Sequence, residues 1–279
     1  MNSLRIPRLL TFLCFALPLA ASLSMPAVAQ TSNAGRDSAV RNIVLVHGAW
    51  ANGSSWSKVI PLLEARGFHV VVAQMPLTSL QEDDAAVERT IERITQANPG
   101  PVLLVGHSYG GVVIGDVPGT DPRVVGLVYV AAFAPDTGQS ALSLLGTLSS
   151  PPPINNYLVF GPPMTFDPLT PTWISDEGIA RAFAQDLSSL EQRELAAVQG
   201  ITFLGDLQAT PTVTPAWKSK PSWFVISAHD DVITAGLEQQ EAQTIGAKAI
   251  ELPTCHVAML QEPGRVADVI SSAAESLSH

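Results

Sequence analysis

The sequence contains few charged residues, and most of them are acidic. Only 14% of the 279 residues are charged, with 25 Asp and Glu against 15 Lys and Arg, and the formal net charge is −10. An acidic chain repels a phosphate backbone, so we expect no nucleic-acid partner. Hydrophobic residues make up 46% of the chain, which is typical of a globular protein with one large core.

Motifs for metal ions and nucleotide cofactors are also missing. The sequence has no HExxH, CxxC or GxGxxG pattern, so we expect no metal, flavin or nicotinamide. Its two cysteines are Cys14 and Cys255. Cys14 lies in an N-terminal segment that we expect to be removed, and one remaining cysteine cannot form an internal disulfide. We interpret Cys255 as a packed apolar residue, with a reactive thiol as the alternative.

The first 29 residues have the pattern of a secretory signal peptide. Arg5 and Arg8 precede an apolar run from Leu9 to Leu23, and Ala27-Val28-Ala29 offers a cleavage site with small residues. The run is about 15 residues, shorter than the ~20 that a spanning helix needs, which argues against the alternative of an uncleaved membrane anchor. We therefore predict that residues 1–29 are removed and that the mature protein begins near Gln30. It would be periplasmic or secreted, with no stable membrane anchor.

Apolar runs of strand length alternate with helical patterns along the rest of the chain. After a polar leader at 30–41, strands are predicted at 43–46, 70–72, 102–105, 124–130, 223–227 and 248–252. Helices are predicted at 54–66, 79–98, 109–117 and 263–277. This alternation predicts an α/β fold with a mostly parallel, doubly wound sheet that helices cover on both faces.

Residues 135–218 interrupt the alternation. They are rich in proline, with three consecutive prolines at 151–153, and they contain one convincing helical pattern, from about Asp176 to Val198. We interpret this stretch, called the cap segment below, as an insertion into a domain that covers residues 42–279.

A serine motif lies between a predicted strand and a predicted helix. Residues 106–110 read Gly-His-Ser-Tyr-Gly, which matches G-x-S-x-G. A tight strand-to-helix turn lifts the serine hydroxyl out of the sheet, and it needs glycines where neighbouring backbones pass closely. Ser108 is therefore the candidate nucleophile.

A serine nucleophile needs a base, and the base needs a carboxylate partner. His256 follows the last predicted strand, at the edge where an open α/β sheet places its site. Asp230 and Asp231 both follow the strand at 223–227, so either can supply the carboxylate, and Asp136 is a rival. The catalytic residues would thus occur in the order Ser, Asp, His.

The oxyanion that forms in acyl transfer needs two hydrogen-bond donors. The main-chain N–H of Tyr109, the residue after the nucleophile, is one candidate. The N–H of Ala49 is the other, because Gly48 lets the loop after the first strand approach closely. We interpret His47 in that loop as a residue that orders the loop rather than as a second base.

Four segments of the sequence match one known pattern. They are residues 44–50 followed by Trp56, residues 105–111, residues 228–233 and residues 255–260. Together they resemble the plant methylesterase and hydroxynitrile lyase branch of the α/β-hydrolases, which also has bacterial members. The resemblance runs from about 42 to 275, implies an α/β-hydrolase fold with an inserted cap, and favours Asp230 over Asp231.

The resemblance also bears on the reaction. Lyases of this branch carry threonine where this chain has Gly48, and lysine, which stabilises departing cyanide, where it has Val257. These differences favour hydrolysis of carboxylic esters through an acyl-enzyme on Ser108. A C–C lyase and a catalytically idle ligand-binding protein are the alternatives, and amides, lactones and thioesters would use the same machinery.

Aromatic residues predict an apolar pocket for a small-molecule ester. The candidate lining residues are Trp50, Phe133, Tyr157, Phe160 and Trp173. The alternative is that these side chains only pack the cap segment on the core.

Overall fold

The computed structural model describes residues 39–116, 121–162, 164 and 166–278. The predicted signal peptide at 1–29 and most of the leader at 30–41 lie outside these residues. Among the described residues, no helix is both long enough and apolar enough to cross a membrane.

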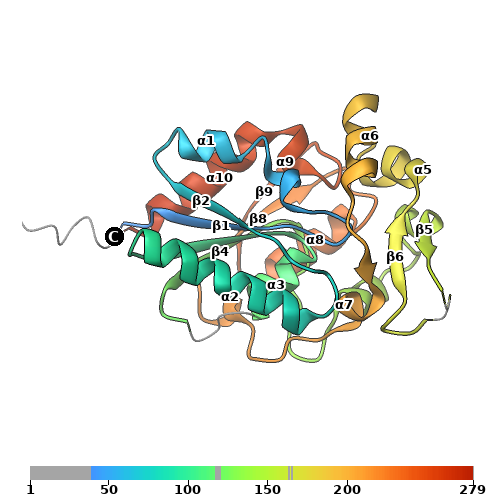
Figure 1. The fold of residues 1–279 in the computed structure, drawn as a ribbon, viewed down its shortest axis with the longest axis horizontal. Helices are drawn as coiled ribbons and strands as arrows, with labels where there is room; N and C mark the ends of the chain where they lie inside the picture. The colour runs from blue at the N-terminus through green and yellow to red at the C-terminus, as the bar shows by residue number, and fades with distance from the viewer. Residues whose placement is uncertain (1–38, 117–120, 163, 165, 279) are drawn as a thin grey trace, which may run out of the picture. The chain divides into compact units, whose positions relative to one another are not determined.

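A six-stranded sheet in the order β2-β1-β3-β4-β8-β9 lies at the centre of the fold (Figure 1). Its strands are β1 (Asn42–Val46), β2 (His69–Ala73), β3 (Val102–Ser108), β4 (Val124–Ala132), β8 (Ser222–Ser227) and β9 (Lys248–Leu252). All neighbouring strands are parallel. Strands β1 and β3 are buried along their whole length because helices cover both faces, whereas the edge strand β9 exposes Lys248 and Glu251. The predicted α/β fold is confirmed.

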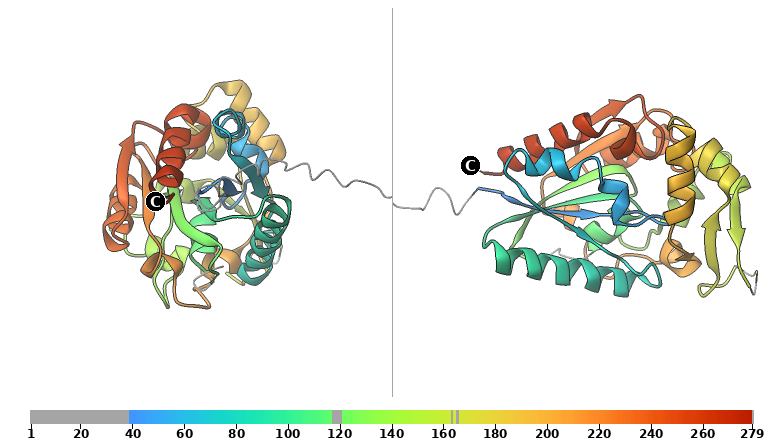
Figure 2. Two further views of the ribbon diagram at one scale, coloured as in Figure 1. Left: turned by 90° about the vertical axis from the view of Figure 1, so that its left-hand side faces the viewer. Right: turned by 45° about the horizontal axis from the view of Figure 1, so that its top comes forward.

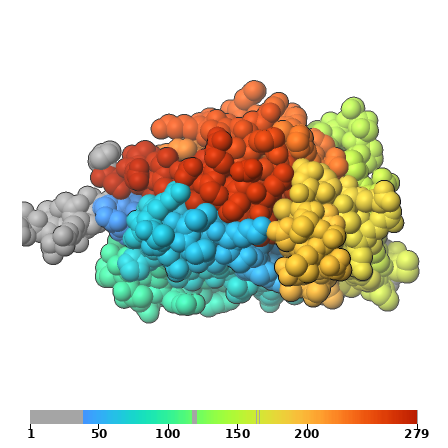
Figure 3. Space-filling view, turned by 90° about the horizontal axis from the view of Figure 1, so that it is seen from above, coloured from blue at the N-terminus to red at the C-terminus, as the bar shows by residue number. Residues whose placement is uncertain are grey.

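Helices form a layer on each face of this sheet. They are α1 (Ile60–Glu64), α2 (Leu80–Ala97), α3 (Gly110–Asp116), α8 (Ala235–Thr244), α9 (Ala258–Gln261) and α10 (Pro263–Ser276). Helices α2 and α3 contact each other on one face, and α1 and α10 contact each other on the opposite face (Figures 1 and 2). Figure 3 shows α1 and α10 side by side, with residues of the cap segment against them at one end.

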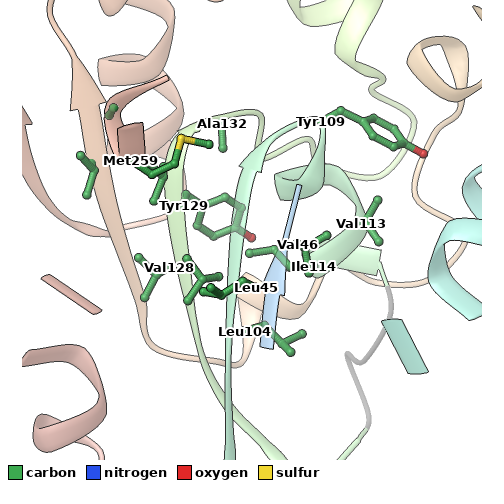
Figure 4. Packing of buried hydrophobic residues seen from close by; sticks show 14 of the residues in the cluster. Leu45, Val46, Leu104, Tyr109, Val113, Ile114, Val128, Tyr129, Ala132 and Met259 are labelled. Carbon is green, nitrogen blue, oxygen red and sulfur yellow. The ribbon is translucent and has the colours of Figure 1, made fainter. Parts of the chain in front are cut away.

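The core lies between the sheet and these helices (Figure 4). Leu45 of β1, Leu104 of β3 and Val128 of β4 are fully buried, as is Ile114 of helix α3. Met259 of α9 closes the core near the carboxyl ends of the strands. The continuous apolar runs of the sequence thus become strands that are buried on both faces.

The cap segment lies between β4 and β8 and has its own antiparallel sheet in the order β5-β6-β7. Its elements are α4 (Ala141–Leu145), η3 (Pro153–Asn156), β5 (Leu158–Phe160), β6 (Pro171–Ile174), α5 (Asp176–Gly178), η4 (Ile179–Phe183), α6 (Ser189–Val198), β7 (Thr202–Phe203), α7 (Leu204–Gln208) and η5 (Ala216–Lys218). Helices α5 and α6 and strands β5 and β6 gather at one end of the central sheet (Figure 1).

Two helix predictions are wrong in their extent. The pattern from Asp176 to Val198 is not one helix: it contains α5, the π-helix η4 and, after a break at Ala184, helix α6. Ser188 restarts the helix because its side chain and that of Glu191 form a reciprocal capping box. The helix predicted at 54–66 is likewise a 3₁₀ turn, η2 (Gly53–Trp56), followed by α1.

Candidate active site

The G-x-S-x-G segment forms the turn between β3 and α3. Ser108 ends the strand with φ +54°, a left-handed conformation that residues other than glycine rarely adopt. A Cβ on Gly106 would lie 2.5 Å from the carbonyl oxygen of Gly110, and a Cβ on Gly110 would lie 2.7 Å from that of His47. Because backbone stands against both positions, only glycine fits, and the turn holds Ser108 in this strained conformation.

His256 and Asp230 form a fully buried pair. His256 Nδ1 lies 2.6 Å from Asp230 Oδ2, and neither side chain is exposed. Asp230 Oδ1 accepts hydrogen bonds from the main-chain N–H groups of Val232 and Ile233 at 2.6 and 3.0 Å. Burial alone would raise the pKa of Asp230, but the charge of His256 and these hydrogen bonds outweigh it and keep the pKa below its usual value. The ionised Asp230 therefore holds a proton on Nδ1 of His256.

The other ring nitrogen of His256 is available as a base. With the proton on Nδ1, Nε2 carries a lone pair, and this buried atom has no hydrogen-bond partner among the described residues. His107, next to the nucleophile, donates from Nε2 to the main-chain oxygen of His256 over 3.0 Å. This hydrogen bond joins the loop that carries His256 to the turn that carries Ser108.

The rival acidic residues have other partners. Asp136 is partly exposed and forms an ion pair with Lys218 at 2.5 Å, which lowers its pKa. Asp231 lies 3.5 Å from the side-chain amide of Gln185, and burial and the charge of Asp230 raise its pKa. Of the three predicted candidates, the structure brings only Asp230 onto His256.

The loop after β1 lies directly against the nucleophile. A Cβ on Gly48 would lie 2.7 Å from Cβ of Ser108, so the backbone of this loop packs directly on the serine turn. This is the position that a source of oxyanion donors requires. His47 accepts a hydrogen bond from the N–H of Met75 at Nε2 (3.1 Å) and donates from Nδ1 to the oxygen of Gly48 (3.0 Å). Both of its ring nitrogens are therefore occupied by backbone, and burial lowers its pKa. His47 orders the loop.

Two of the five predicted pocket residues lie beside the nucleophile turn. The N–H of Phe133 donates to the main-chain oxygen of Ser108 over 3.2 Å. Trp50 lies in the loop after β1 and lines a cavity of about 10 Å³ together with His107. Both aromatic side chains are almost completely buried.

The other three predicted pocket residues belong to the cap segment. Phe160 is in β5, Trp173 is in β6, and Tyr157 directly precedes β5; all three are half-buried. No hydrogen bond or ring contact in the described part of the chain joins them to Ser108 or His256. Their assignment to the pocket stays a prediction.

Two residues that contact His256 were missed by the sequence analysis. The ring centroid of His107 lies 4.7 Å from that of His256, and the ring centroid of Phe183 lies 5.1 Å from it. His107 is part of the serine motif, so its place beside Ser108 in the sequence could have indicated that it lies close to His256. Phe183 had no such signal, because it comes from the π-helix inside the segment that was predicted as one long helix.

Cys255 directly precedes the base, and its thiol is free and buried. Burial raises the pKa of this thiol to about 11, so the thiolate is scarce at neutral pH. Cys255 is therefore better described as a packed apolar residue than as a reactive thiol. The part of the chain that the structure describes also has no group of three or more His, Cys, Asp or Glu side chains that could hold a metal ion.

Known proteins share this fold, and several match most of the chain in sequence. The model of the alpha/beta hydrolase family matches residues 43–269. Salicylic acid-binding protein 2 from Nicotiana tabacum is 28% identical over 247 residues, which cover 81% of this chain and 94% of that protein. Methylesterase 1 from Arabidopsis thaliana is 25% identical over 256 residues, with coverages of 82% and 94%. A crystal structure of the pyrethroid hydrolase PytH matches with a TM-score of 0.72 at 19% identity and covers 86% of this chain and 100% of that one, which shows a common fold.

The curated relatives define the class of the protein as an ester-cleaving hydrolase. Within this class, the chain belongs to the alpha/beta hydrolase family. The resemblance to plant methylesterases that the four sequence segments predicted is confirmed.

Proposed function

We propose that the protein hydrolyses small, largely apolar carboxylic esters through an acyl-enzyme on Ser108. The observation that carries this proposal is the buried hydrogen bond of 2.6 Å between His256 and Asp230, which leaves Nε2 of His256 without a partner among the described residues. The strained serine turn and the glycine loop beside it supply the other parts that acyl transfer needs.

The reaction begins when Ser108 Oγ attacks the ester carbonyl and its proton passes to Nε2 of His256. The N–H groups of Ala49 and Tyr109 stabilise the oxyanion, and Asp230 stabilises the charged imidazole. His256 then protonates the alcohol as the C–O bond breaks, which leaves the acyl group on Ser108. A water molecule then gives a proton to His256 and attacks the acyl-enzyme. The bond to Ser108 Oγ breaks, His256 returns the proton to this oxygen, and the carboxylic acid is released.

The surroundings of the base favour an apolar substrate. Phe183 packs on His256, and Phe183, Val257 and Trp50 line a cavity of about 10 Å³ beside His107. The net charge of −10 disfavours anionic substrates. An ester without charged groups therefore suits these apolar side chains best.

The same residues argue against the lyase alternative. Val257 is buried and carries no charge that could stabilise a departing anion. A side chain on Gly48 would meet Cβ of Ser108, so the site has no room for threonine without a shift of the loop. The name of the tobacco relative refers to ligand binding, which keeps an idle binding protein as an outcome to be tested.

A fluorophosphonate probe and an ester panel separate these functions. We expect the probe to label the wild-type protein and not the Ser108→Ala variant. We also expect nitrophenol release from p-nitrophenyl acetate and butyrate, and no cyanide from mandelonitrile. Cyanide release without ester turnover would support a lyase. Equal labelling of both proteins would show that Ser108 is not the nucleophile.

We also propose that residues 1–29 are a signal peptide and that the mature protein acts in the periplasm or the medium. The pattern of Arg5, Arg8 and the Ala27-Val28-Ala29 site supports this. Mass spectrometry of the protein from its native source should find an N-terminus near Gln30. Intact residues 1–29 in soluble cytoplasmic protein would contradict it.

A further inference from the structure

Two threonines of the cap segment form hydrogen bonds with Trp50, the residue after the proposed oxyanion donor Ala49. The main-chain N–H of Trp50 donates to Thr202 Oγ1 over 2.7 Å, and its indole N–H donates to Thr172 Oγ1 over 3.0 Å. Thr172 Oγ1 in turn donates to the main-chain oxygen of Thr202 over 2.7 Å. All three residues are buried. Strands β6 and β7 thus hold both the backbone and the side chain of Trp50.

The held residue has a strained backbone. Trp50 has φ +56°, a left-handed conformation that is unfavourable for a non-glycine residue and persists only where surrounding contacts enforce it. The peptide group whose N–H binds Thr202 joins Trp50 to Ala49, the proposed oxyanion donor. Gly48, one residue earlier, packs on Ser108. A relaxation of Trp50 would therefore turn the backbone that presents the Ala49 N–H.

The contact with Trp50 is part of a longer seam between the cap segment and the loop. A Cβ on Gly200 would lie 3.1 Å from the oxygen of Ala51, and the side-chain amide of Asn52 donates to the oxygen of Val198 over 2.5 Å. Residues 198–202 thus follow residues 50–52 along the core. The two threonines lie at the buried end of this seam, against Trp50.

We propose that Thr172 and Thr202 are positioning residues for the oxyanion hole, which their hydroxyl groups complete by holding Trp50 in its left-handed conformation. This inference rests on the proposed acyl-transfer function. Neither threonine touches the reacting atoms. Their effect would act through the oxyanion hole, which stabilises the transition state, rather than through substrate binding. The oxyanion hole is then fully formed only when β6 and β7 are seated on the core.

The first test replaces Thr202 with valine, which has the same shape and no hydroxyl. We expect Thr202→Val to lower kcat for p-nitrophenyl butyrate about 10-fold with KM within about 2-fold, because a misplaced oxyanion donor acts mainly on the transition state. Thr202→Ser keeps the hydroxyl and should restore kcat. The control is Glu191→Gln, which removes the ion pair between the cap segment and Lys58 of the core without touching Trp50, and should leave kcat unchanged.

A second measurement separates positioning from a purely structural role. A trifluoromethyl ketone forms a tetrahedral adduct with an active serine, so its inhibition constant reports on the oxyanion hole. We expect Thr202→Val, and Thr172→Val if the first variant does not fold, to weaken this inhibition about as much as kcat falls. A lower Tm with unchanged kcat and inhibition would overturn the inference. If the wild-type protein is not labelled by fluorophosphonate, the proposed function fails first; if it is labelled and the valine variants behave like wild type, this inference alone fails.

Discussion

The parallel-sheet core and the cap segment contribute to one site in different ways. The core supplies Ser108, Asp230 and His256, which are buried and held by main-chain contacts at the carboxyl ends of strands. The cap segment is built from short elements, and its longest helix, α6, has no buried residue. Among its residues, Met164 and Phe166 are 75% and 71% exposed. The core therefore carries the candidate reacting groups, while the cap segment contacts their surroundings through Phe183 and the two threonines at Trp50.

The contrast between the two regions should be largest in stability. Phe224 of β8 is fully buried and stacks on Tyr129 of β4, with ring centroids 5.7 Å apart. Phe224→Ala should lower the free energy of unfolding by about 3–5 kcal/mol, because it leaves a cavity in the core. The matched variant Phe166→Ala, in the cap segment, should change it by less than about 0.5 kcal/mol. Denaturant unfolding measures both, and equal losses would show that the cap segment is as tightly packed as the core.

The next effect concerns the acid of the core. Asp230→Asn should lower kcat at least ~10²-fold, because the amide oxygen would accept the two main-chain N–H groups and leave the NH2 group facing Nδ1 of His256, which forces the wrong tautomer. Asp231→Asn and Asp136→Asn are the matched controls and should cost less than about 3-fold, since both side chains bind residues other than His256. Steady-state kinetics with p-nitrophenyl butyrate checks this ranking. A larger loss in either control would mean that the acid is assigned wrongly.

A smaller, pH-dependent effect is expected where the cap segment meets the core. Asp206 of α7 is buried, and Asp83 of α2 is its main charged neighbour, followed by Glu82. Burial and the charge of Asp83 raise the pKa of Asp206 to about 8. The stabilisation by protonated Asp206 is complete below its unfolded pKa of about 4 and is lost as the pH rises through about 8.

Asp206→Asn removes this ionisation, so the variant should gain stability relative to wild type as the pH rises. The Tm of the variant minus the Tm of wild type should increase between about pH 5 and pH 9. Asp167→Asn, at an exposed site in the cap segment, is the control and should show a constant difference. A pH-independent difference for Asp206→Asn would mean that Asp206 is already ionised in the folded protein.

The core could be predicted from the sequence because its signals are local. A strand buried on both faces requires a continuous apolar run, and residues 102–105 already show one. The close backbone contacts at Gly106 and Gly110 require glycine, so the serine turn is visible in the motif itself. Local signals did not distinguish Asp230 from Asp231; only the family resemblance favoured Asp230, and in the folded loop its carboxylate lies on His256.

The cap segment could not be predicted to the same depth. Strands β5, β6 and β7 are two to four residues long and exist through pairing with distant residues, so no periodic pattern identifies them. Helix α8 was also missed, since its sequence has no clear apolar face. Phe183 and the two threonines at Trp50 acquire their roles only through tertiary contacts.

The acyl-enzyme on Ser108 is the central claim, and peptide mass spectrometry tests it most directly. The wild-type protein is mixed with p-nitrophenyl butyrate, quenched in acid within the first turnovers, and digested with a protease. We predict one butyryl group on the peptide that contains Ser108, and no adduct in the Ser108→Ala variant. Ester turnover without an adduct, or a butyryl group on another residue such as Cys255, would contradict this account.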